Sequence, residues 1–152
     1  MKPKTIIFTA VLLLTACSPA AIPVPTVVPT PTPQPCSVQA AAYLNESHKL
    51  YNHMIEKTEL ASSTAQLVFM EMALAPIIDE LQNIKFEVEA LEYPPCAREL
   101  QRYLVSTMEF NINFFLSYLR DESIETIENW DYNYKLNLDK YIQERERILN
   151  EQ

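Results

Sequence analysis

The chain of 152 residues contains no glycine. Glycine is the residue that adopts positive φ angles without steric cost, and two-residue β-hairpin turns usually depend on it. Phosphate-binding loops, dinucleotide fingerprints and nucleophile elbows also require glycine at fixed positions. Its absence therefore argues against a hairpin-rich all-β fold and excludes enzymes built on those three motifs.

Apolar residues recur at helical spacing in four segments between residues 37 and 148. The clearest stripe, between Ser62 and Tyr93, alternates steps of three and four: Leu67, Met70, Leu74, Ile77, Leu81, Ile84, Val88 and Leu91. Weaker stripes occupy residues 37–60, 100–119 and 124–148. Because short connections force neighbouring helices to run in opposite directions, we expect an all-α fold, an antiparallel up-down four-helix bundle.

Caps and prolines predict where these helices begin and end. We expect a turn at residues 61–63, since Ser63-Thr64-Ala65-Gln66 has the form of a capping box. Pro94-Pro95 should end the second helix, because the residue before a proline resists the helical region. Pro76 should kink that helix or split it.

The remaining boundaries lie near the C-terminus. The third helix should stop near Arg120-Asp121, and either Asp121 or Ser123 could cap the fourth. Residues 143–152 are mostly charged or polar, so we expect the last turns to fray.

The N-terminus has the parts of a secretory signal. Lys2 and Lys4 precede a mostly apolar run, residues 6–14, which is too short to span a membrane. The following Leu14-Thr15-Ala16-Cys17 resembles the lipobox of bacterial lipoproteins. This resemblance implies cleavage before Cys17 and a diacylglycerol on its thiol, so that the mature protein is anchored to a membrane by lipid. The alternative is an ordinary secreted protein that is cut nearby.

Three regions follow: a signal peptide (1–16), a lipid-anchored Pro/Thr-rich linker (17–35) and a helical domain (36–152). Seven prolines between residues 18 and 35 favour a disordered, extended polyproline II stalk. Cleavage would remove Lys2 and Lys4, leaving ten Lys and Arg against 20 Asp and Glu, a net charge of −10. That charge argues against nucleic-acid partners and against electrostatic attachment to anionic lipid. We expect an extracytoplasmic location in the cell envelope, at either the inner or the outer membrane.

The two remaining cysteines are expected to form a disulfide. Cys36 opens the first helix and Cys96 the third, and alternate helices of an up-down bundle start at the same end. Disulfides persist outside the cytoplasm. The alternative is two unpaired thiols.

Candidates for chemistry are few. His53 and Glu56 lie three residues apart on one helix face, but they supply at most half of a metal site. His48 and His53 point about 140° apart around a helix. We find no catalytic motif, expect no cofactor or metal, and interpret the protein as a non-enzyme.

The aromatic residues of the last two helices exceed what one stripe can bury. Exposed aromatics rimmed by acidic groups are common at protein interfaces. The predicted partner surface consists of Phe110, Phe114, Tyr118, Trp130 and Tyr132. The alternative is that these side chains fill a wide core.

Three further segments, residues 61–64, residues 81–87 and Pro95-Cys96, are similar to stalked helical extracytoplasmic domains of environmental bacteria. That resemblance supports the fold and the disulfide and implies no activity. The favoured function is a non-catalytic, lipid-anchored module that binds an envelope or protein partner. The alternatives are a structural envelope spacer, and a ligand-binding or enzymatic bundle with a pocket near Pro76.

Overall fold

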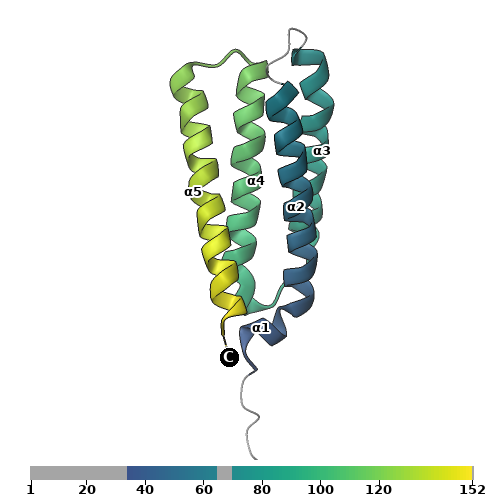
Figure 1. Cartoon of the computed structure of the whole chain (residues 1–152), viewed down its shortest axis with the longest axis vertical. Coiled ribbons are helices and arrows are strands. Elements are labelled where there is room, and N and C mark those ends of the chain that lie inside the picture. The colour runs from purple at the N-terminus through teal and green to yellow at the C-terminus, as the bar shows by residue number, and fades with distance from the viewer. Residues whose placement is uncertain (1–33, 65–69, 152) are drawn as a thin grey trace, which may run out of the picture. The chain divides into compact units, whose positions relative to one another are not determined.

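The structure, a computed structural model, describes residues 34–64 and 70–151, and the side chains of Met70 and Glu71 are not described. The described residues are helical and contain no strand. The elements are α1 (Cys36–Gln39), α2 (Ala41–Thr64), α3 (Met70–Ala90), the 3₁₀ helix η1 (Pro95–Ala97), α4 (Arg98–Leu119) and α5 (Ile124–Leu149). The four long helices lie side by side in a helical bundle (Figure 1). The all-α prediction is confirmed, and the short α1 is an additional helix because Ala40 separates it from α2.

The core contains the described part of the predicted stripe, whereas Leu67 and the Met70 side chain lie outside the description. Leu74, Leu81 and Val88 are buried there, together with Ile77 and Ile84. They pack in one apolar cluster with Met54 of α2, Leu104 and Phe115 of α4, and Tyr141 of α5. Full burial of such a side chain stabilises the fold by about 1.5–3 kcal/mol, so this cluster fixes the side-by-side packing of the helices.

The predicted turn at residues 61–63 is wrong, because α2 continues through Thr64. Ala61 and Thr64 are buried on the core side of the helix. The hydroxyls of Ser62 and Ser63 donate to the carbonyl oxygens of Thr58 and Leu60, at 2.9 and 2.8 Å. These serines therefore satisfy their hydroxyls within the helix rather than capping the next one. The rest of the predicted capping box lies outside the described residues.

Pro76 does not split α3, which is helical from Met70 to Ala90. The helix ends four residues before Pro94-Pro95, where the Leu91 N–H donates to Val88 O at 3.1 Å. The stop predicted from the two prolines is confirmed. Proline cannot donate a backbone hydrogen bond, so Pro94-Pro95 suits the extended link that leads into η1.

The connection between α4 and α5 has the predicted position. Arg120 follows the last residue of α4, and Asp121 has a φ of 51°, in the left-handed region that aspartate tolerates better than most residues. Of the two candidate caps, Ser123 is the one used, since its Oγ accepts from the Thr126 N–H at 3.3 Å.

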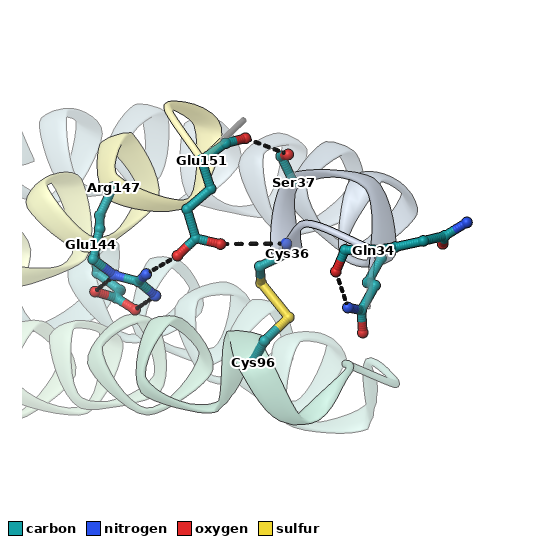
Figure 2. Close-up of a disulfide and its surroundings, with 8 residues drawn as sticks. Gln34, Cys36, Ser37, Cys96, Glu144, Arg147 and Glu151 are labelled. Atoms are coloured by element: carbon teal, nitrogen blue, oxygen red, sulfur yellow. Dashed lines mark hydrogen bonds and ion pairs between the residues drawn. A yellow bond between two sulfur atoms is a disulfide. The ribbon is translucent and has the colours of Figure 1, made fainter. Parts of the chain in front are cut away.

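Cys36 and Cys96 form the predicted disulfide, with Cα atoms 5.9 Å apart. Figure 2 shows how the end of the chain joins this site. The Glu151 carboxylate accepts from the Cys36 N–H at 3.3 Å and pairs with Arg147, while the Ser37 hydroxyl donates to Glu151 O at 2.9 Å. The expected fraying of the last turns is wrong, because α5 continues to Leu149 and Glu151 is held against α1.

Candidate binding surface

Four of the five predicted surface residues form two aromatic pairs. Phe110, Phe114 and Tyr118 recur at every fourth residue along α4, and the rings of Phe114 and Tyr118 are 5.2 Å apart. The Phe110 ring lies 5.9 Å from that of Trp130 on α5. All four side chains are partly buried. We call these four residues and residues 124–136 of α5 the α4–α5 face.

Tyr132 lies apart from the four. It follows Trp130 by two residues, which turns its side chain about 200° around α5. It is 64% exposed, whereas Trp130 packs against α4. Tyr132 therefore extends the α4–α5 face on the outer side of α5 and does not contribute to the Phe110–Trp130 contact.

The first half of α5 is less covered than the second. The buried residues of α5 are Asn137, Tyr141 and Ile148, so none lies between Ile124 and Leu136. Ile124 is 75% exposed. This half of the helix carries aromatic and apolar side chains without the coverage that α5 receives after residue 137.

Acidic groups surround this half of α5. Between residues 120 and 131 the sequence has five acidic residues and one basic residue, Arg120. Arg120 lies 3.7 Å from Glu122, and Lys135 pairs with Asp131 at 2.6 Å. Within the described chain, Glu125 and Glu128 have no ion pair. The α4–α5 face is thus apolar in its centre and negatively charged around it.

Among the described residues, α4 is bordered by cavities on two sides. One, of about 220 Å³, lies between α3 and α4 and is lined by Gln82, Lys85, Phe86, Glu109, Ile112, Asn113 and Leu116. The other, of about 250 Å³, lies between α4 and α5 beside Tyr103, Lys140 and Arg147.

The histidines and the anchor give no site geometry. His53 and Glu56 are both exposed on α2. Over residues 34–64 and 70–151, no three His, Cys, Asp or Glu side chains are grouped as a metal ion would require. No helix in the same ranges is long and apolar enough to cross a membrane. Cys17, the predicted lipidation site, and residues 1–33 lie outside the described residues.

A buried polar network at the disulfide end was not predicted. The Tyr43 hydroxyl donates to Gln101 Oε1 at 2.8 Å, and Gln101 Nε2 donates to Val88 O at 2.7 Å. Burial raises the pKa of Tyr43 well above its usual range. The network links α2, α4 and the end of α3. The sequence signal for this network was Gln101, a polar residue that directly follows Leu100 of the apolar stripe of α4.

No protein-family model matches this chain, and neither a curated protein nor a solved structure matches it.

Proposed function

We propose that the protein is a lipid-anchored, extracytoplasmic binding module without catalytic activity. In this proposal Cys17 carries the lipid, residues 18–35 form a stalk, and residues 36–152 form an antiparallel up-down four-helix bundle in the cell envelope. The bundle binds a protein partner through the α4–α5 face. The lipobox-like Leu14-Thr15-Ala16-Cys17 supports the anchor, and the disulfide agrees with an oxidising compartment.

The observation that supports binding most strongly is the uncovered first half of α5. Ile124 and Tyr132 are exposed on the outer side of α5, and Trp130 and Phe114 are only partly buried where α5 meets α4. Aromatic residues at the centre of an interface contribute much of its binding energy when a partner excludes water from them. A partner that covers this face would bury the first half of α5, as the bundle itself already buries the half beyond residue 137.

The charge of the face predicts the chemistry of the partner. Glu125 and Glu128 stand beside the apolar centre without cationic partners among the described residues. A partner segment with lysine or arginine at its rim would therefore associate faster than a neutral one, and increasing salt would slow that association. We expect apolar anchors at the centre of such a segment.

Site-specific photo-crosslinking in intact host cells tests this surface. A crosslinking side chain at Tyr132 should give one defined adduct, and the same group at Phe86 of α3 is the matched control because Phe86 is also exposed, at 60%. The adduct should be lost when Ile124→Ser and Glu128→Lys are introduced together. Equal adducts at both positions, or none at Tyr132, would favour the structural spacer instead.

The anchor has its own test. Intact mass of the protein from host membranes should correspond to a chain that begins at Cys17 with added acyl groups, and reduction should add two hydrogens at the disulfide. An unacylated chain would contradict the anchor and leave the α4–α5 face to be judged by crosslinking alone.

A further inference from the structure

Three exposed apolar side chains lie in one row along the first half of α5. Ile124, Tyr132 and Leu136 are 75%, 64% and 37% exposed. Glu128, which is also exposed, completes a spacing of four residues. Side chains at this spacing are neighbours on a helix and form a ridge inclined by about 26° to its axis. We call these four residues the α5 ridge; its ends lie about 18 Å apart, because a helix rises about 1.5 Å per residue.

The α5 ridge faces away from the bundle. The Trp130 ring lies 5.9 Å from the Phe110 ring of α4, so this side of α5 is turned toward α4. Glu128 and Tyr132 each lie two positions from Trp130, which turns them to the opposite side of the helix. Between residues 124 and 136, α5 has no buried residue. The described helices therefore leave the ridge accessible to a partner.

A segment that covers the α5 ridge must pair its own backbone groups. The N–H and C=O groups along α5 bond within the helix, and the described residues contain no strand whose edge could receive an extended segment. An extended segment pressed against the ridge would therefore bury peptide groups without partners, which is unfavourable. A helix pairs these groups internally. The grooves between its own rows of side chains also accept such a ridge, at a crossing angle of about −50°.

The charge beside the ridge favours a basic partner. Glu125 and Glu128 are exposed and form no ion pair with any described residue. Asp131, by contrast, is paired with Lys135 at 2.6 Å. A second copy of this chain would bring the same glutamates against each other, and an anionic lipid surface would repel them as well. Lysine or arginine side chains would complement them.

We propose that the partner binds through one amphipathic α-helix with lysine or arginine side chains beside Glu125 and Glu128. This helix packs across α5 at about −50°, with one of its grooves on the α5 ridge. The inference rests on the proposed function, because it names the kind of partner that the α4–α5 face receives. It excludes an extended segment, a second copy of the chain and a lipid surface as the occupant of the ridge.

Photo-crosslinking at single ridge positions tests the form of the partner. A photoreactive side chain is placed in the full chain at Ile124, Tyr132 or Leu136, and the peptides of each adduct from intact host cells are sequenced by mass spectrometry. Two helices that share a ridge rise equally along it, so the partner residues joined to Ile124 and Leu136 should lie about 12 positions apart. An extended partner rises about 3.3 Å per residue and would place them about five positions apart.

Ile142 is the matched control. It lies on the same helix beyond the ridge and is 39% exposed, close to Leu136, and it should give no adduct with the same partner segment. An equal adduct there would overturn the ridge as the docking site.

The remaining outcomes separate this inference from the proposed function. A separation of about five positions, or adducts with a second copy of the chain, would overturn the helical partner and leave the α4–α5 face as a binding surface. No protein adduct at any ridge position, or lipid in place of protein at all three, would contradict the proposed function and the helical partner together.

Discussion

The two ends of the bundle differ in how completely they are closed. At the disulfide end, Cys36–Cys96, Glu151 and the Tyr43–Gln101 hydrogen bond join α1, α2, α4 and α5. At the other end, residues 124–136 of α5 include no buried residue. Both halves of α5 have a helical apolar pattern, so periodicity alone does not say how fully a helix is covered.

Charge follows the same division along α5. Residues 140–151 contain three basic and three acidic residues, and Arg147 pairs with both Glu144 and Glu151. Residues 120–131 contain one basic and five acidic residues. The covered half is thus balanced by internal pairs, whereas the uncovered half retains an excess of negative charge. This difference in charge supports the proposal that the second end, and not the first, binds a partner.

The largest expected effect comes from the disulfide. Replacing both cysteines, Cys36→Ser with Cys96→Ser, should lower the free energy of unfolding by about 4 kcal/mol, because the bridge closes a loop of 60 residues in the unfolded chain. Urea denaturation followed by circular dichroism measures this change. A loss below about 1 kcal/mol would show that the non-covalent contacts alone close this end.

The core of the disulfide end should be more sensitive than the start of α5. Leu100→Ala should cost about 3 kcal/mol, because Leu100 is completely buried and its truncation leaves a cavity. Ile124→Ala removes a side chain of similar size that is 75% exposed, and it should change stability by less than about 0.5 kcal/mol. Thermal unfolding of the two variants compares the two ends directly. Equal losses of stability would contradict the difference in burial between them.

The sequence predicts where the helices lie better than it predicts how far their neighbours bury them. The stripe of α3 and the stop before Pro94-Pro95 follow from local spacing and chemistry. Local chemistry limits the cap of α5 to Asp121 or Ser123, and the disulfide follows from the expected order of the helices. The predicted turn at residues 61–63 was wrong because serine hydroxyls can also donate to carbonyl oxygens within a helix, as Ser62 and Ser63 do here. Such ambiguity is resolved only by tertiary contacts, here the burial of Ala61.

Longer-range contacts explain the other differences. Glu151 holds α1 across a separation of 115 residues, and no local pattern indicates that pairing. The polar network of Tyr43 and Gln101 likewise joins residues 58 apart. The contact between the rings of Tyr51 and Tyr141 depends on which faces of α2 and α5 meet, and stripes of apolar residues alone leave this open.

A smaller effect should follow from loosening Glu151. Glu151→Gln keeps the side-chain shape but removes the charge that pairs with Arg147 and that accepts from the Cys36 N–H. We expect a loss of about 1 kcal/mol, since the contacts are partly exposed and screened by solvent. Glu146→Gln, in the last turns of α5 and exposed, is the control and should have no effect in urea denaturation. Equal stability of both variants would restore the expectation that this terminus frays.

The smallest effect at neutral pH is expected at Tyr141. Tyr43→Phe should cost about 1 kcal/mol, because it leaves Gln101 Oε1 buried without its donor. Tyr141→Phe should cost less, since the hydroxyl it removes makes no hydrogen bond as short as that of Tyr43. Urea denaturation of both variants at pH 7 compares the two hydroxyls.

The same tyrosine should matter in alkali. Burial raises the pKa of Tyr141 from 10.0 to about 12, so the unfolded chain loses this proton first as the pH rises. Its contribution is therefore present below pH 10 and is lost as the pH approaches 12. Tyr141→Phe should make the decline of stability over this range shallower, although Tyr134, whose pKa burial also raises to about 12, still contributes. An unchanged decline in the variant would contradict the burial of the Tyr141 hydroxyl.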